Sequence, residues 1–306
     1  MDVVEMHRRA TEEFARLVAT VAPDQWTAPT PCVGWTVRDL VNHVIGEERW
    51  AVPLLHGKTI ADVGTSLDGD LLGDDPVGAV FEAAQAAQDA VPEPVQERRK
   101  VHLSYGEEDV DEYISQLIAD HLVHGWDLAV AIGAPRRFDP ELVSEVSRWF
   151  ADREELYRTS GAIGPRRGGD QTDPQDALIV AFGRDPGWTQ QHAVVAEFGA
   201  ATDRRDVDAM MALMTDDCVF ETTGPAPDGG RYEGAEAVRE QWQRLFDDTT
   251  EPEFHTEEMF VSGDRAVVRW RYTWRAPNDS PGHVRGVDVI RIRDGKIAEK
   301  LSYVKG

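Results

Sequence analysis

The sequence predicts two domains, an all-α bundle followed by an α+β domain. Through the first 180 or so residues, apolar side chains recur three and four positions apart, which is typical of amphipathic helices. In the last sixty residues, apolar and polar side chains alternate instead, and the alternating runs are separated by glycine–aspartate pairs. At 306 residues the chain has the length expected for two domains. We expect the boundary near residues 183–189, with domains at 1–186 and 187–306.

The first domain is predicted to be a bundle of four or five helices joined by loops. Thr36 is followed three positions later by Asp39, a capping-box spacing that marks the start of the second helix. Pro92 and Pro94 are expected to end the third helix. The stretches 57–75 and 161–176 are predicted loops, and 95–109 shows no clear pattern. The expected helices are 4–21, 37–55, 76–91, 111–132 and 141–159.

The second domain is predicted to place helices beside a curved antiparallel sheet. Gly263-Asp264 and Asp294-Gly295 each separate two alternating runs, a strong hairpin signal. The expected helices are 189–203, 206–214 and 235–246, and the expected strands are 218–222, 254–261, 265–274, 284–293 and 297–303.

Composition narrows the classes of partner and the compartment. The formal net charge is −24, from 56 acidic and 32 basic residues. A surface this acidic repels nucleic-acid phosphates and anionic lipid, so we expect neither nucleic acid nor a membrane as a partner. The two cysteines, Cys32 and Cys218, are far apart and form no CxxC pair, which favours a reducing compartment. The N-terminus lacks the apolar core of a signal peptide, and we predict a cytoplasmic protein.

The predicted helix 111–132 carries a pair of potential metal ligands. Asp120 and His124 are four residues apart, so they lie about 40° apart on one helix edge and can face the same ion. His43, on the second predicted helix, can supply a third ligand across the bundle, with His121 as an alternative to Asp120. Imidazole and carboxylate ligands suit zinc, with iron, nickel and manganese as alternatives. The competing interpretation is a set of partly buried histidines that only form hydrogen bonds or ion pairs. His7, His56 and His102 stand in polar contexts and are expected to be solvated.

The second domain has its own candidate residue, Asp288. It shares a strand face with glycine and isoleucines, and an unpaired carboxylate on an apolar face has a raised pKa. Asp288 is therefore the candidate general base, and Trp270, Tyr272 and Trp274 would line its substrate cavity. In the alternative interpretation, Asp288 pairs with an arginine such as Arg239 or Arg269, or opens to solvent at the sheet end.

Two motifs of the first domain carry a family resemblance. PCVGWTVRDLVNHV and ADHLVHGWDLAVAIG, followed by DPQDALIVAFGRDP, resemble an actinobacterial metal-binding family related to mycothiol-dependent maleylpyruvate isomerase and to DinB-like proteins. The resemblance implies a DinB-like four-helix bundle with a divalent metal, held here by His43, Asp120 and His124. It also implies a low-molecular-weight thiol, such as mycothiol, as a second cofactor. The family's acidic ligand is glutamate, and Asp120 is one methylene shorter. The isomerase's substrate-recognising residues are not found, so maleylpyruvate is not implied.

Residues 190–306 resemble the SnoaL-like branch of the nuclear transport factor 2 superfamily. The similarity runs from AVVAEFGAATDRRDVDAMMALM through RYEGAEAVREQW to RGVDVIRIRDGKIAEK. It implies a cone-shaped α+β barrel with an apolar pocket, in which Asp288 matches the pocket aspartate of the enzymes. The oxyanion pair of ketosteroid isomerase is not evident.

Three hypotheses about function follow. The first is an isomerase, cyclase or metal- and thiol-dependent transferase that acts on a small apolar organic molecule. The second is a non-catalytic binder of a hydrophobic molecule, with a structural or vestigial metal site. In the third, only the second domain is active, and the bundle is a dimerisation module that pairs two copies of the chain.

Overall fold

A computed structural model describes residues 1–167, 169–247, 253–275 and 281–305. The chain divides into two compact units, Met1–Trp188 and Thr189–Gly306, and each is described by itself. Within the described residues, no helix is both long and apolar enough to cross a membrane.

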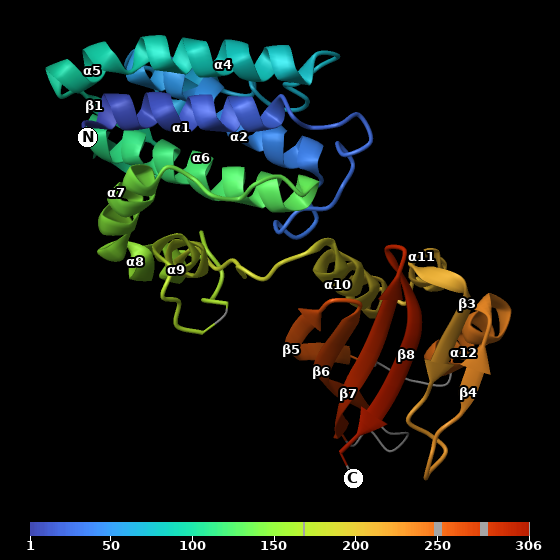
Figure 1. Ribbon diagram of the computed structural model, residues 1–306. Coiled ribbons are helices and arrows are strands. Elements are labelled where there is room, and N and C mark those ends of the chain that lie inside the picture. Colours follow the sequence, from blue (N-terminus) through green and yellow to red (C-terminus); the bar gives the residue numbers. More distant parts are fainter. Residues whose placement is uncertain (168, 248–252, 276–280, 306) are drawn as a thin grey trace. The chain divides into compact units, whose positions relative to one another are not determined.

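The N-terminal unit is built on four long helices, as predicted. Helix α1 packs against α4 and α6, and α2 packs against the same two helices, which closes a four-helix bundle (Figure 1). Within the described residues, five further helices and two short strands complete the unit. The helices are α1 Val3–Val18, α2 Val37–Leu55, α3 Ile60–Val63, α4 Pro76–Ala90, α5 Pro92–Glu97, α6 Val110–Ile132, α7 Pro140–Ala151, α8 Glu154–Thr159 and α9 Pro174–Ala181, and the strands are β1 Lys100–Leu103 and β2 Gly106–Asp109.

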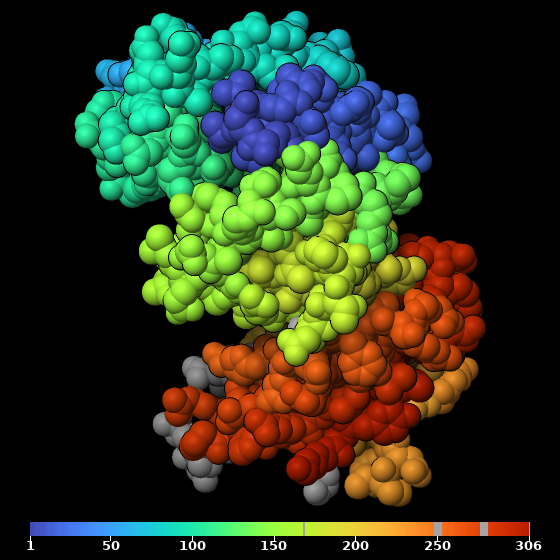
Figure 2. Space-filling model, turned by 60° about the vertical axis from the view of Figure 1, so that its left-hand side comes forward, coloured from blue at the N-terminus to red at the C-terminus, as the bar shows by residue number. Residues whose placement is uncertain are grey.

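Local sequence signals account for most of the helix ends. Thr36 and Asp39 form the predicted capping box at the start of α2. Gly133 ends α6 in the left-handed conformation, with a φ of 70°, which a residue without a Cβ adopts at little cost. The N-terminal segment, blue in Figure 2, lies against the green segment that follows α6, where Arg9 pairs with Asp139 at 3.1 Å.

The third helix ends where the prolines predicted, because α4 stops at Ala90. Pro92 then occupies the first turn of α5, where proline's missing N–H costs nothing. The patternless stretch 95–109 contains an antiparallel hairpin of β1 and β2. The single helix expected over 141–159 is interrupted at residues 152 and 153 and forms α7 and α8.

In its described part, the C-terminal unit pairs three helices with one sheet, as predicted. The sheet has the order β4-β3-β8-β7-β6-β5, and its pairs are antiparallel except for the parallel pair of β3 and β8 (Figure 1). The elements are α10 Gln190–Asp203, α11 Val207–Ala212, β3 Met214–Glu221, β4 Arg231–Glu233, α12 Ala235–Asp247, β5 Glu253–Ser262, β6 Arg265–Arg275, β7 Pro281–Arg293 and β8 Lys296–Val304.

Both predicted two-residue hairpin turns are present. Asp294 and Gly295 have φ values of 53° and 72°, so both central residues of that turn adopt the left-handed conformation that suits a tight hairpin. Inside the unit, the helices and the inner sheet face enclose an apolar core around Trp242, whose ring stacks on Phe220 at a centroid distance of 4.3 Å. This core fixes the inner face of β7, on which Asp288 lies.

Candidate metal centre

Helix α6 is the central helix of the N-terminal unit and brings three potential site residues to one side. From His121 to Ala131 every side chain is buried, because other elements of the bundle surround the helix. Asp120 and His124 lie one turn apart, as the sequence predicted, and Asp127 follows three residues after His124. Helix α2 faces this side of α6 and contributes His43 and, one turn later, Glu47.

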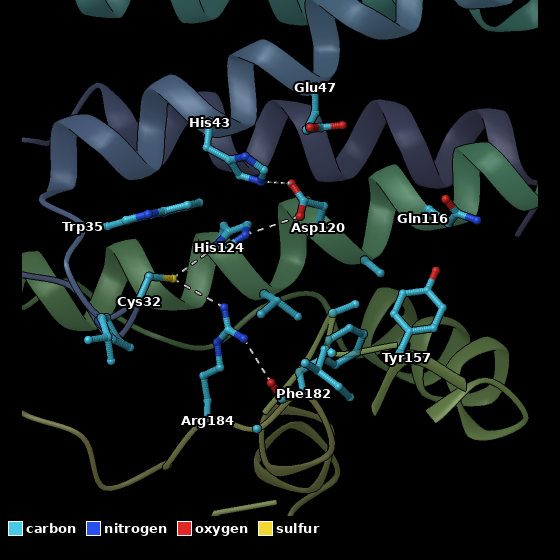
Figure 3. A pocket seen from close by; sticks show the side chains of 18 of the residues that line it. Cys32, Trp35, His43, Glu47, Gln116, Asp120, His124, Tyr157, Phe182 and Arg184 are labelled. Carbon is cyan, nitrogen blue, oxygen red and sulfur yellow. Dashed lines mark hydrogen bonds and ion pairs between the residues drawn. The ribbon is translucent and has the colours of Figure 1, made fainter. Parts of the chain in front are cut away.

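The structure brings His43, Asp120 and His124 together. His43 Nε2 lies 3.6 Å from Asp120 Oδ2, and His124 Nε2 lies 3.3 Å from Asp120 Oδ1 (Figure 3). The three donor atoms lie within 4.8 Å of one another. Among the described residues, Asp120 Oδ2 is buried and has no hydrogen-bond partner. A buried carboxylate that has one such oxygen and is flanked by two imidazole nitrogens fits a divalent cation, and the donor set suits zinc. These residues therefore fit the metal that the resemblance implied.

The electrostatics of this group favour a positive charge among the three residues. Burial raises the pKa of Asp120, but the nearby imidazoles of His124 and His43 outweigh burial and hold that pKa below its usual range. Burial lowers the pKa of His124, yet Asp120 and Asp127 raise it well above its ordinary value. Burial and the charge of Asp120 together raise the pKa of Glu47. The carboxylates therefore stabilise a cation at the imidazoles, either a proton or a metal ion.

A second cluster lies behind His124. Its Nδ1 is 3.0 Å from Asp127 Oδ2, and the thiol of Cys32 donates to the same oxygen at 3.2 Å. The guanidinium of Arg184 donates to Asp127 Oδ2 at 2.9 Å and to Cys32 Sγ at 3.4 Å. Burial raises the pKa of Asp127, but Arg184 and His124 prevail and lower it. Cys32, His124 and Asp127 form the second group of potential ligands in the described residues, but Arg184 already supplies a cation there.

Both clusters open into one cavity of about 850 Å³. Trp35, from the loop before α2, packs over the imidazoles, with ring centroids 5.0 Å from His43 and 5.8 Å from His124. The far side of the cavity carries Gln116 and Tyr157 (Figure 3). Apolar wall is supplied by Leu117, Val123, Ile163 and Phe182. The cavity volume falls in the range that is usual for small-molecule sites.

The alternative ligand His121 does not reach this cavity group. Its Nδ1 bonds to the Leu117 carbonyl oxygen at 2.7 Å, and its Nε2 bonds to Glu48 Oε1 at 2.6 Å. Both ring nitrogens are therefore engaged inside the bundle, and the ring packs edge-on against Phe14 and His7.

His7 was expected to be solvated. This expectation is wrong, because His7 is only 1% exposed. His56 is exposed and His102 is half-exposed, in line with expectation.

Asp288 is not the unpaired carboxylate that the strand pattern indicated. It is 7% exposed and pairs with Lys300 Nζ at 2.9 Å, and Ser302 donates to it at 2.7 Å. The register of β7 against β8 places Ser302 opposite Asp288 and Lys300 two residues away on the same face. Neither arginine that was considered as its partner takes this role. Arg239 pairs with Asp208, and Arg269 with Glu257 and Glu258.

The three aromatic residues assigned to the second pocket have different surroundings. Trp270 is buried, and its ring lies so close to Gly286 that a Cβ there would come within 2.3 Å of it. Tyr272 lines a cavity of about 240 Å³ together with Phe246 and Phe254. Trp274 stacks on Tyr272 at a centroid distance of 5.5 Å. Of the three, Tyr272 is the one placed on a cavity wall by these contacts.

Cys32, Arg184 and Trp35 were not identified as site residues from the sequence. Cys32 and Trp35 lie in PCVGW, and Arg184 in DPQDALIVAFGRDP, two of the motifs that carried the family resemblance. One signal could have found Cys32 and Arg184. Each is a cysteine or a charged residue within a motif whose other residues form turns or pack in the core. Their roles depend on contacts between segments more than 50 residues apart.

Comparison with known proteins agrees with the two-domain arrangement. Residues 7–129 match the family described as mycothiol maleylpyruvate isomerase N-terminal domain, and residues 195–300 match the SnoaL-like domain. Two uncharacterized proteins of Mycobacterium tuberculosis, from strains CDC 1551 and H37Rv, are each 34% identical over 149 residues, which is 47% of this chain and 75% of the relative.

Solved structures are similar to the C-terminal part of the chain. An NTF2-like protein of unknown function from Mesorhizobium loti is 38% identical, with a TM-score of 0.34, and the match covers 38% of this chain and 92% of that one. A putative polyketide cyclase from Sinorhizobium meliloti is 25% identical, with a TM-score of 0.31, over 38% of this chain and 99% of the other. On the strength of the sequence matches, the chain belongs to the family of the two mycobacterial proteins and joins a mycothiol maleylpyruvate isomerase-type N-terminal domain to a SnoaL-like domain.

Proposed function

We propose that the N-terminal unit is a metal-dependent enzyme domain that acts on a small, largely apolar organic molecule. The observation that carries this proposal is the convergence of His43, Asp120 and His124 at the wall of a cavity of about 850 Å³. Three protein ligands leave a coordination position open, which is the arrangement of catalytic rather than structural zinc sites. The reaction classes that fit are isomerisation, cyclisation and thiol-dependent transfer, and the matched family's description supports mycothiol as the thiol.

The residues around the cavity have separable roles in such a reaction. A divalent metal, when bound, lowers the pKa of a thiol or water, or polarises a carbonyl. His43, Asp120 and His124 hold the ion, and Trp35 covers the two imidazoles and keeps water from that side. Glu47 lies on the cavity wall one turn from His43, where its carboxylate can take a proton from a bound molecule and return it.

Metal content of the protein, purified without a histidine tag, tests the proposal. We expect about one equivalent of zinc in the wild type and loss of the metal in His43→Ala and His124→Ala. His102→Ala, at a half-exposed histidine outside the cluster, is the matched control and should keep the metal. Less than about 0.1 equivalent in the wild type, after dialysis against zinc and then buffer, would contradict the proposal.

The thiol requirement is tested separately by calorimetry. Mycothiol titrated into zinc-loaded wild type should bind, whereas the His124→Ala variant should show no heat of binding. Binding of equal strength in both proteins would mean that the thiol does not reach the metal group.

A different function is favoured for the C-terminal unit, namely binding without catalysis. The ammonium group of Lys300 forms an ion pair with Asp288 and compensates the charge of this carboxylate, which makes it a poorer base than the unpaired carboxylate that the strand pattern indicated. The cavity beside Tyr272, at about 240 Å³, is slightly smaller than the usual range of about 300–1,000 Å³ for organic ligands, and Phe246 and Phe254 line it. Tyr272→Ala should weaken binding of a small apolar fluorescent probe, while Asp288→Asn should leave it unchanged. The opposite pattern would restore Asp288 as the functional residue of this unit.

A further inference from the structure

The carboxylate of Asp127 is the centre of a buried hydrogen-bond cluster. It is fully buried, and its Oδ2 lies 3.0 Å from His124 Nδ1, 3.2 Å from Cys32 Sγ and 2.9 Å from Arg184 Nη2. Arg184 Nε adds a contact of 3.3 Å to each carboxylate oxygen. Three different segments of the chain therefore direct hydrogen-bond donors at the Asp127 carboxylate. This carboxylate lies behind the proposed metal group, on the side of His124 opposite to its Nε2 atom.

The direction of these hydrogen bonds decides which nitrogen of His124 faces the ion. An ionised carboxylate only accepts hydrogen bonds, so the ring nitrogen that meets Asp127 must carry a hydrogen. With the hydrogen on Nδ1, the lone pair of a neutral imidazole is on Nε2. Nε2 is the atom that lies 3.3 Å from Asp120 and within the group formed with His43. The cluster thus presents the metal-binding nitrogen to the cavity.

Arg184 keeps this arrangement in place. A fully buried carboxylate without a cation is costly, and the guanidinium supplies the opposite charge at 2.9 Å. The guanidinium is itself held, because its Nη1 donates to the Phe182 carbonyl oxygen at 3.0 Å (Figure 3). Because Arg184 approaches Asp127 through both Nε and Nη2, it fixes the orientation of the carboxylate as well as its charge.

We propose that Asp127 is a positioning residue, held by Arg184, that fixes His124 with its hydrogen on Nδ1 and so sets the affinity for metal without being a ligand. The inference rests on the proposed function, since it takes His43, Asp120 and His124 as the ligands. Partners of this kind commonly change metal affinity by about 10- to 100-fold when they are removed. Cys32 completes the same hydrogen-bond cluster. It is not a ligand in this arrangement, because the cationic guanidinium of Arg184 already lies beside both the Cys32 sulfur and the Asp127 carboxylate.

Cobalt binding by Asp127→Asn tests the role of the carboxylate. Asparagine retains one acceptor oxygen, which Arg184 will take, and its amide then presents a donor to His124 Nδ1, so the ring hydrogen moves to Nε2. We expect the Kd for Co²⁺, followed by its visible absorption, to rise about 10- to 100-fold. Glu112→Gln is the matched control, since Glu112 also lies on α6 and pairs with an arginine, Arg153, at 2.6 Å. Its Kd should stay within about twofold of the wild type.

The outcomes separate the two proposals. If the wild type binds no Co²⁺, the proposed function fails, and this inference fails with it. If the wild type binds Co²⁺ and Asp127→Asn binds equally tightly, the metal centre stands and the positioning role is refuted.

A second measurement needs no change at Asp127 and so does not depend on the variant folding. In zinc-loaded protein with ¹⁵N-labelled histidine, the His124 resonances are assigned by their loss in His124→Gln. We expect Nδ1 to carry hydrogen and Nε2 to show the shift of a metal-bound nitrogen. A metal-bound Nδ1 would overturn the inference and place the ion in the group of Cys32, His124 and Asp127.

Discussion

Acidification should weaken the N-terminal unit through His7, a histidine buried against His121 in the bundle. Burial, followed by the charge of His121, lowers the pKa of His7 from 6.5 to about 3. Its Nε2 is buried and meets no hydrogen-bond partner among the residues that the structure describes, so the protonated ring finds no acceptor there at that atom. Between pH 6.5 and about 3 the unfolded chain therefore binds one more proton at this residue than the folded chain does.

The sign and size of the effect follow from linkage. Because the unfolded state binds more protons, the free energy of unfolding falls as pH falls through this window, by about 1.4 kcal/mol per pH unit. Lowering the pH from 7 to 5 crosses about 1.5 pH units of this window. Protonation linked to His7 should therefore lower the free energy of unfolding by about 2 kcal/mol. The variant His7→Leu, which has a side chain of similar size without the titrating group, should escape this loss.

Urea unfolding at pH 7 and pH 5, followed by far-UV circular dichroism, measures the effect on the helical unit. The stability difference between His7→Leu and the wild type should shift by about 2 kcal/mol in favour of the variant at pH 5. His56→Leu, at an exposed histidine, controls for the removal of a histidine as such. A difference between His7→Leu and wild type that is the same at both pH values would refute the reasoning.

Three further predictions concern single side chains. Iodoacetamide should alkylate Cys32, which lines the large cavity, at least about tenfold faster than Cys218, which is fully buried and whose thiol pKa is raised by burial, with peptide mass spectrometry as the readout. Equal rates would contradict the assigned exposures. Lys300→Met should cost about 3–5 kcal/mol in urea unfolding because it leaves Asp288 buried without its cation, and adding Asp288→Asn to it should recover part of the loss. Full additivity of the two changes would show that they do not interact. Trp242→Ala should cost about 3–5 kcal/mol, since this ring is 1% exposed and stacks within the C-terminal core, and a loss under about 1 kcal/mol would mean that the core refills the space.

The sequence was most informative where the physical signal lies within one element. The periodicity of 111–132 predicted α6, and the i, i+4 spacing predicted that Asp120 and His124 share an edge. The capping pair Thr36 and Asp39 located the start of α2, and with it the approximate height of His43. Hairpin turns at Gly263 and Asp294 were equally local, because two-residue turns require particular backbone conformations.

Where the signal depended on a neighbour from elsewhere in the chain, the sequence pattern misled. The face of β7 indicated a lone Asp288, because alternation along one strand does not show that β8 places Lys300 beside it. In the same way, the polar context of His7 indicated solvent, whereas packing of α1 against α6 buries it. His121, adjacent to Asp120 in sequence, points to Glu48 instead, because neighbouring helical residues lie about 100° apart.

By itself, the sequence predicted the two-domain plan, the helices that form the bundle, and His43, Asp120 and His124 as ligands with His121 as an alternative. Only the tertiary structure decided which of the histidines face the cavity and that Cys32, Asp127 and Arg184 form one cluster behind His124. The physical reason is the sequence separation over which each kind of interaction acts. Helix periodicity and capping act between residues at most a few positions apart, whereas Arg184 meets Asp127 across 57 positions and Cys32 meets it across 95. Such contacts arise from the packing of whole helices and loops, and no local pattern encodes them.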